Sequence, residues 1–263
     1  MAAYINVIVN GGNNFRKEAH EQEEHCLNML CDLILFIQNQ YKSEDIRSIL
    51  LPAGFFCVPN EIEVNKLADK VAKRLSLLNP PFKIIWGIDG ATDGKKGKKI
   101  SKPKPPGHPY YIFALGPGQK EPTKFQQASV NSVEGRNEIL LDTNWGNRPI
   151  CIPKTKEALL ICGEIWSDKL LKKVCDAQPE VLFVPAHQKV NLMTDPRNRW
   201  ASMSWHFPLS KFSKTSGIPI MLSEHTRTSK RHTYVWPQNI RVNDLNLPHN
   251  MQSLFLHAKL VHS

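Results

Sequence analysis

Short runs of apolar residues recur along the chain, and segments with the spacing of amphipathic helices separate them. Continuous apolar runs of this length indicate buried strands, whereas apolar residues three and four apart indicate helices. Strands that alternate with helices predict an α/β architecture. We expect strands over 4–9, 48–51, 82–88, 110–115, 158–162, 181–184 and 218–222, and helices over 20–41, 59–78, 167–174 and 197–216.

The length of 263 residues permits one large domain or two small ones. The sequence has no internal repeat and no clear linker, so we predict a single domain over residues 1–263. A stretch rich in lysine and proline, at about residues 94–108, falls between two strands of this domain. Its prolines predict an irregular insertion rather than a boundary between two halves.

The net charge of +10 is concentrated in one stretch. Between Gly94 and Lys124 there are eight lysines and a single acid, Glu121, which together account for +7 of the total. Such a stretch is either a solvated loop or a contact for a polyanion, made by the lysines of 95–104. No aromatic residue lies among those lysines before Tyr110, so they lack the stacking partners typical of nucleic-acid sites.

The sequence also limits which cellular compartment and which cofactors we expect for this protein. No apolar run approaches the ~18 residues of a transmembrane helix. The first residues lack the basic and apolar regions of a signal peptide, so we expect a cytoplasmic protein without membrane contact. The six cysteines are then expected to be free thiols. Neither they nor the ten histidines have zinc spacing, and we predict no metal and no cofactor.

The segment most indicative of chemistry is Leu159–Trp166, with the sequence LLICGEIW. A buried strand ends there at Cys162, and a glycine and an acid follow. In α/β sheets the carboxyl ends of strands are where ligands meet side chains, so Cys162 is expected at the rim of the sheet. Gly163 allows a sharp turn and the close approach of a substrate.

This segment resembles the nucleophile motif of the nitrilase, or carbon–nitrogen hydrolase, superfamily. The later segment Leu182–Ala186 is similar to the strand that follows in that family, and the resemblance covers roughly residues 4–225. It implies an α-β-β-α sandwich with two mixed sheets and helices outside. It also implies a homodimer and a Cys–Glu–Lys triad that acts on a non-peptide amide or nitrile through a thioester.

Carried over residue by residue, the resemblance makes Cys162 the nucleophile. Lys124 is expected to stabilise the anionic intermediate, with Lys120 as the second choice. Glu134 is similar in place to a second acidic residue that some members of the family use. Chemically this set is coherent, because a cation beside a cysteine lowers the pKa of its thiol.

Three further residues are expected at the substrate. Glu164 matches the acid after the nucleophile, where it is also able to bind backbone amides of the turn. Trp166 follows in the same motif, and His187 follows the next strand.

The sequence departs from the family at the position of the triad glutamate. The family has a Pro-Glu pair there, whereas this chain has Pro52 followed by Ala53. Loss of a positioned general base typically slows a reaction ~10²–10⁴-fold. The primary interpretation is therefore a cysteine-dependent hydrolase-like protein impaired by this loss. The alternative is a catalytically inactive binding or scaffold module of the same fold, with a polyanion as partner.

Overall fold

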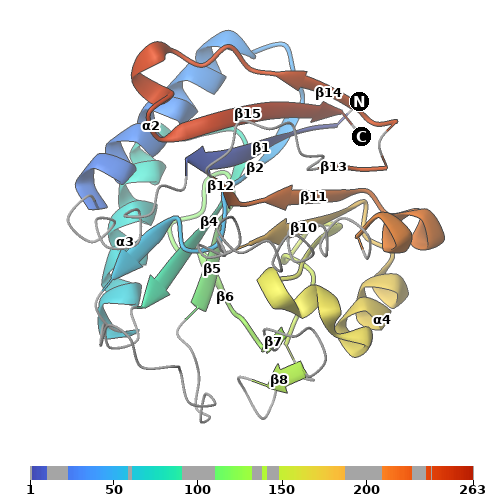
Figure 1. Cartoon of the computed structure of the whole chain (residues 1–263). Helices are drawn as coiled ribbons and strands as arrows, with labels where there is room; N and C mark the ends of the chain where they lie inside the picture. The colour runs from blue at the N-terminus through green and yellow to red at the C-terminus, as the bar shows by residue number, and fades with distance from the viewer. Residues whose placement is uncertain are drawn as a thin grey trace, which may run out of the picture.

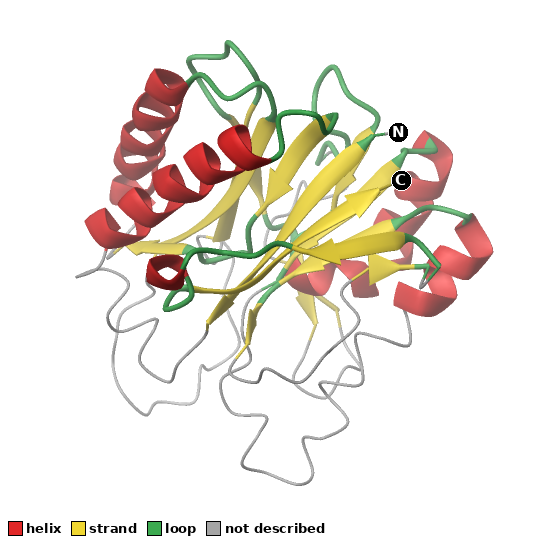
Figure 2. Cartoon of the chain, turned by 90° about the horizontal axis from the view of Figure 1, so that it is seen from above, coloured by secondary structure: helices red, strands yellow, loops and turns green. Residues whose placement is uncertain are grey.

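Two β-sheets pack face to face, and helices cover their outer faces (Figures 1 and 2). The three labelled helices are α2 (Glu23–Gln40), α3 (Glu61–Leu78) and α4 (Asp168–Ala177). This computed structural model describes residues 2–10, 23–58, 61–90, 110–131, 138–140, 148–186, 209–226, 235–237 and 239–262. The predicted lysine-rich insertion at 94–108 lies outside these residues.

The first sheet is mixed and has the central order β14-β15-β1-β2-β4-β5-β6. Strands β1, β2 and β4 are parallel, whereas β15 runs antiparallel to β1 and β5 antiparallel to β4. Two short strands join it at the side, β3 beside β4 and β12 beside β1. The bounds are β1 Ala3–Asn10, β2 Ile46–Leu50, β3 Phe56–Val58, β4 Lys83–Gly90, β5 Tyr110–Leu115, β6 Thr123–Gln126, β12 His225–Thr226, β14 Arg241–Asp244 and β15 Phe255–His262.

The second sheet has the order β13-β11-β10-β9, with β9, β10 and β11 parallel and β13 antiparallel. A separate hairpin joins β7 to β8. The bounds are β7 Ser129–Asn131, β8 Glu138–Leu140, β9 Glu157–Leu159, β10 Val181–Pro185, β11 Ile220–Ser223 and β13 Val235–Trp236. Two mixed sheets between helical layers are the α-β-β-α sandwich that the family resemblance implies.

Side-chain alternation explains the layers. Along β10, Leu182 and Val184 face the cluster under α4 and the helix at 209–216, whereas Phe183 faces the other sheet. Along β4, Ile84 faces the cluster under α2 and α3, and Ile85 faces inward. Because successive strand residues point to opposite faces, every central strand is buried on both sides. The layer between the sheets forms a third apolar cluster.

The structure confirms most expected elements. Of the helix expected over 197–216, only residues 209–216 lie within the described part of the chain. The strand expected over 158–162 ends at Leu159, and a 3₁₀ helix, η2 (Cys162–Trp166), begins three residues later. The sequence gives only a weak signal after residue 225, yet β15 lies there and pairs with β1 along seven registered residue pairs. The first sheet therefore extends beyond the 4–225 range of the resemblance.

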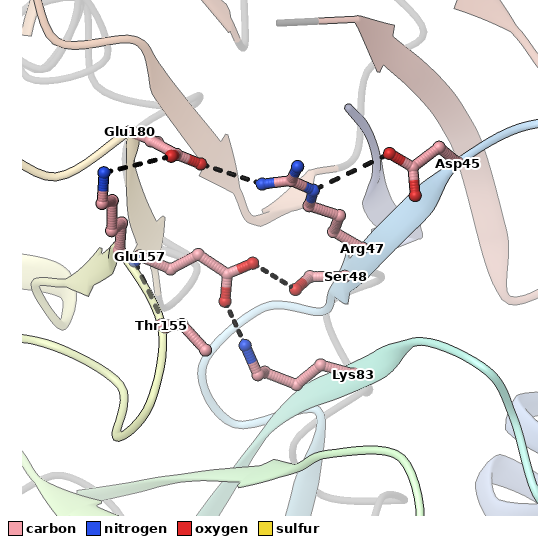
Figure 3. Close-up of polar contacts among 8 residues, drawn as sticks. Asp45, Arg47, Ser48, Lys83, Thr155, Glu157 and Glu180 are labelled. Atoms are coloured by element: carbon pink, nitrogen blue, oxygen red, sulfur yellow. Dashed lines mark hydrogen bonds and ion pairs between the residues drawn. The ribbon is translucent and has the colours of Figure 1, made fainter. Parts of the chain in front are cut away.

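A polar cluster bridges the two sheets at the amino ends of β4 and β9 (Figure 3). Lys83 of β4 pairs with Glu157 of β9, and both side chains are at least nine-tenths buried. Ser48 of β2 donates to the other oxygen of Glu157 at 2.8 Å. Nearer the surface, Arg47 and Glu180 form a half-exposed ion pair at 2.9 Å.

Candidate active site

The carboxyl ends of the central strands in both sheets meet at one edge of the sandwich. Strand β12, which follows β11, pairs in parallel with the end of β1, at Val9 and His225. Asn6 of β1 also donates to the carbonyl of Leu222 at the end of β11, at 2.9 Å. The two sheets therefore point their strands the same way, and residues after β2, β4, β9 and β10 gather at this edge, where α/β proteins bind ligands.

Cys162 stands at this edge in a strained backbone conformation. It follows β9 after two residues and begins η2, with φ of +46°. Residues other than glycine rarely adopt this left-handed region, and such outliers are typical of functional turns. The side chain is partly exposed and packs against both the inter-sheet cluster and the cluster under α4. The thiol is thus presented at the end of the strand rather than sealed in the core.

A buried carboxylate holds this turn. Glu164 is fully buried, and its Oε2 accepts the backbone N–H of Ile161 at 2.7 Å. Its Oε1 accepts the backbone N–H of Ala128 at 2.6 Å. These contacts confirm that Glu164 binds backbone amides of the turn. They occupy both oxygens within the protein, so this placement gives Glu164 a structural position rather than one open to substrate.

Arg148 completes the clamp on the turn. Its Nη2 lies 3.0 Å from Glu164 Oε2, and its other nitrogens donate to the carbonyls of Gln126 at 3.1 Å and Leu159 at 3.2 Å. Burial lowers the pKa of the Arg148 guanidinium, and the charge of Glu164 opposes that shift. The pair thus ties the end of β6 to the end of β9, on either side of the Cys162 turn.

Ala53 lies where the resemblance places a glutamate. It follows β2 after two residues, is 1% exposed, and belongs to the inter-sheet cluster that Cys162 also contacts. Its carbonyl oxygen lies 3.0 Å from Nε2 of His225, so the imidazole donates to it. The structure brings position 53 to the edge that holds Cys162, but its methyl group offers no proton acceptor.

Lys124 does not lie beside the thiol. It pairs with Phe113 of β5, and both side chains face α3. Its Nζ donates to Asn65 of α3 at 2.9 Å and lies 4.1 Å from the centre of the Tyr111 ring. The adjacent Phe125 faces the inter-sheet cluster instead. Alternation along the strand therefore puts Lys124 on the opposite face of the sheet from Cys162, and a role at the thiol would require its side chain to leave these partners.

Gln127 is the polar residue that this alternation brings to the inner face. It lies two residues after Phe125, is fully buried, and directly precedes Ala128, whose N–H binds Glu164. Its own N–H donates to the carbonyl of Tyr110 at 2.9 Å. Gln127 was not among the expected site residues, because the resemblance pointed to a lysine at this place in the chain. The sequence does contain a signal for Gln127. Phe125 is apolar and faces inward, and residues two apart in a strand share a face, so Gln127 is expected on the inner face as well.

The remaining predicted site residues are placed as follows. Trp166 ends η2 and is partly buried against the cluster under α4, on the outer side of the second sheet. Glu134, His187 and the lysines of 95–104 lie outside the described residues.

Neither a metal-ligand cluster nor a membrane-spanning helix occurs among the residues that the structure describes. Among them, no group of three or more histidine, cysteine, aspartate or glutamate side chains could hold a metal ion. No helix in the described ranges has the length and apolar character to span a membrane.

No protein-family model matches the sequence, and no curated protein matches it. Solved structures do match. An amidase of the nitrilase superfamily from Nesterenkonia, in a cysteine-to-alanine mutant, superposes with a TM-score of 0.52 at 13% identity, over 85% of this chain and 75% of that chain. The amidase from Nesterenkonia sp. gives a TM-score of 0.51 at 14% identity over the same shares. The chain has the nitrilase fold.

One mutant of that amidase carries an adduct in two structures. A glutamate-to-glutamine mutant shows covalent addition of the acetamide moiety of fluoroacetamide at the active-site cysteine, with a TM-score of 0.52 at 15% identity over 85% of this chain and 75% of that one. The same mutant shows Michael addition of acrylamide at that cysteine, with a TM-score of 0.51 at 13% identity over 85% and 78%. At these identities the likeness establishes the nitrilase fold of this chain and not its activity.

Proposed function

We propose that this chain is a carbon–nitrogen hydrolase-like protein whose Cys162 thiol attacks a small non-peptide amide or nitrile and forms a thioester. The observation that carries the proposal is the conformation of Cys162. Its φ of +46° at the end of β9 is maintained by the buried Glu164–Arg148 clamp. Backbone outliers that the surrounding structure holds in place cluster at active sites, and this one carries a partly exposed thiol.

The chemistry divides the proposed reaction into two halves. The thiol of Cys162 adds to the carbonyl carbon, the nitrogen leaves, and water then cleaves the thioester. The oxyanion of each tetrahedral intermediate requires a hydrogen-bond donor. Gln127 is a candidate donor, because it is buried and directly precedes Ala128, whose N–H binds Glu164 of the turn. Glu134 remains assigned to the site by resemblance alone, whereas Lys124 would have to leave Asn65 and Tyr111 to reach the thiol.

The alanine at position 53 is expected to slow turnover more than thiol addition. Addition needs one proton removed from sulfur, whereas turnover also needs a proton delivered to the leaving nitrogen and one taken from water. The Nesterenkonia amidase supports this distinction, since its glutamate-to-glutamine mutant still shows adducts at the active-site cysteine. We therefore expect thioester formation followed by slow hydrolysis.

The experiment is to incubate the full chain with fluoroacetamide and a panel of short aliphatic amides. Intact-mass measurement then follows the protein, and ammonia release follows turnover. The expected result is a mass increase on Cys162 that Cys162→Ser abolishes and Cys175→Ser leaves in place. Absence of any adduct on Cys162, with ammonia release at the blank rate, would overturn the proposal.

A second candidate is a non-catalytic binding module, and two placements favour it. Ala53 offers no base, and Lys124 is engaged by Asn65 on the far face of the sheet. In that case a bound amide raises the melting temperature without forming an adduct, and Cys162→Ser leaves this shift unchanged. The expected polyanion partner would then bind through the lysines of 95–104, with an affinity that falls as salt rises.

The homodimer and the cytoplasmic location also remain proposals. The dimer rests on the resemblance, and sedimentation of the full chain across a concentration series tests it. Fractionation of cells that express the chain tests the location.

A further inference from the structure

The segment after β2 lies directly on β4. A Cβ atom added to Gly87 would lie 2.6 Å from Cα of Ala53, so only a glycine allows the segment to approach this closely. A Cβ atom added to Gly54, whose φ is +64°, would lie 2.5 Å from Oδ2 of Asp89. The two glycines thus let Ala53 lie against β4 at Gly87 and let Gly54 lie against the Asp89 carboxylate.

Asp89 faces the layer between the sheets. Along β4, Trp86 and Ile88 belong to the cluster under α2 and α3, whereas Ile85 belongs to the inter-sheet cluster. A period of two puts Gly87 and Asp89 on the same inner face as Ile85. Asp89 is 5% exposed and lies one residue before the end of β4. A buried carboxylate therefore stands at the strand-end edge, next to the position where the family's glutamate is missing.

His225 fixes this arrangement from the other side. It is 6% exposed, and its Nε2 donates to the carbonyl of Ala53 at 3.0 Å. Its strand, β12, follows β11 of the second sheet and pairs with β1 of the first. The 52–54 segment is thus held between an imidazole and a carboxylate, and His225 acts as a positioning residue for it.

We propose that Asp89, reaching from β4, supplies the proton-transferring carboxylate that Ala53 cannot supply. This inference rests on the proposed function. The Asp89 carboxylate takes the proton of the Cys162 thiol as sulfur bonds to the carbonyl carbon. It returns that proton to the nitrogen as the carbon–nitrogen bond breaks. It then takes a proton from the water that attacks the thioester, and sulfur recovers this proton as the carbon–sulfur bond breaks. The sum is amide plus water giving carboxylic acid plus ammonia.

The test is the rate of acrylamide addition to Cys162 across a pH series, followed by intact-mass measurement on the full chain. In the wild-type chain the rate is expected to vary little from about pH 6 to about pH 8, because a carboxylate removes the proton. In Asp89→Asn the rate is expected to fall at least about tenfold at neutral pH and to rise about tenfold per pH unit, since only the free thiolate then reacts. Asp69→Asn, the same change at an exposed position of α3, is the matched control.

The wild-type profile keeps the inference falsifiable if Asp89→Asn folds poorly, because a wild-type rate that rises about tenfold per pH unit would itself overturn the role of Asp89. A double-mutant cycle tests the same role independently of the pH profile. Ala53→Glu restores a carboxylate from the other strand, and its gain in rate is expected to be about tenfold larger in the Asp89→Asn background than in the wild-type background. Equal gains in both backgrounds, or a wild-type pH profile in Asp89→Asn, would overturn the role of Asp89 while leaving the reactive thiol established. A wild-type Cys162 that fails to react would overturn both this inference and the proposed function.

Discussion

The guanidinium of Arg148 lies 3.0 Å from the carboxylate of Glu164, and both side chains are at least nine-tenths buried. Each group also binds backbone, so the pair joins the end of β6 to the turn that carries Cys162. A buried pair with these extra hydrogen bonds offsets the large desolvation free energy of its two charges. The strained turn that carries Cys162 therefore depends on this buried ion pair.

Removal of one partner should be strongly destabilising. Glu164→Gln leaves the Arg148 charge buried without a counter-charge, and we expect the free energy of unfolding to fall by about 3–5 kcal/mol. Urea denaturation measures this change. Glu180→Gln is the control, since Glu180 pairs with Arg47 at a half-exposed site and should cost less than about 1 kcal/mol. Equal losses in the two variants would mean that the buried pair does not hold the turn.

The Lys83–Glu157 pair, at the opposite edge of the sandwich, should show energetic coupling (Figure 3). Lys83→Met and Glu157→Gln each leave one partner uncompensated, and each should cost about 3–5 kcal/mol. The double variant should cost at least about 1 kcal/mol less than the sum, because no isolated charge remains. Thermal and urea unfolding give the three values. Additive losses would contradict the assignment of this pair as a bridge between the sheets.

The exposed pair Glu63–Lys66 on α3 provides the reference for that cycle. It has the i,i+3 spacing of surface helix pairs, whose coupling is about 0.2–0.5 kcal/mol. The coupling free energy of the buried Lys83–Glu157 pair should be clearly larger than that of Glu63–Lys66.

His257 should make stability depend on pH near neutrality. Burial and the charge of Lys259 lower the pKa of His257, against the opposing charge of Asp244. The unfolded chain then binds this proton more readily than the folded chain, so stability falls as pH drops through about 6.5. His257→Gln should flatten the slope of the unfolding free energy between about pH 7.5 and about pH 5.5. The exposed His249→Gln serves as control, and a slope unchanged by His257→Gln would contradict the assignment.

The central fold was predictable because its pattern is local. Continuous apolar runs indicated β4, β5 and β10, and Ser167, which accepts the N–H of Leu170, marks the start of α4 as its residue type predicts. Strand β15 was harder to find, since His257, Lys259 and His262 interrupt its apolar residues. In the sheet these polar residues are only partly buried, while Ala258 and Leu260 face the core. Apolar and polar residues do alternate along β15. However, β15 pairs with β1 at the other end of the chain, and a local pattern does not predict such a pairing.

The site was predictable only in part, for a geometric reason. The turn at Cys162 is formed by consecutive residues, so the sequence alone was enough to predict it. The assignment of Lys124 depended on residue type, whereas the face that a residue occupies depends on the register of β6, which Phe125 sets. Asp89 lies near the end of β4, whereas Gly54 lies in the segment after β2. Their contact joins residues that are distant in the sequence, so no local pattern predicts it.

The most direct test of the nucleophile is the relative rate at which acrylamide modifies the cysteines of the folded chain. Peptide mapping after brief exposure at neutral pH gives the modified fraction of each thiol. Cys162 should react at least about tenfold faster than Cys175, which is also partly exposed but lies on the ordinary helix α4. Cys26 should stay unmodified until the chain unfolds, because burial raises the pKa of its thiol to about 12. Equal rates at Cys162 and Cys175 would contradict an activated thiol at the strand end.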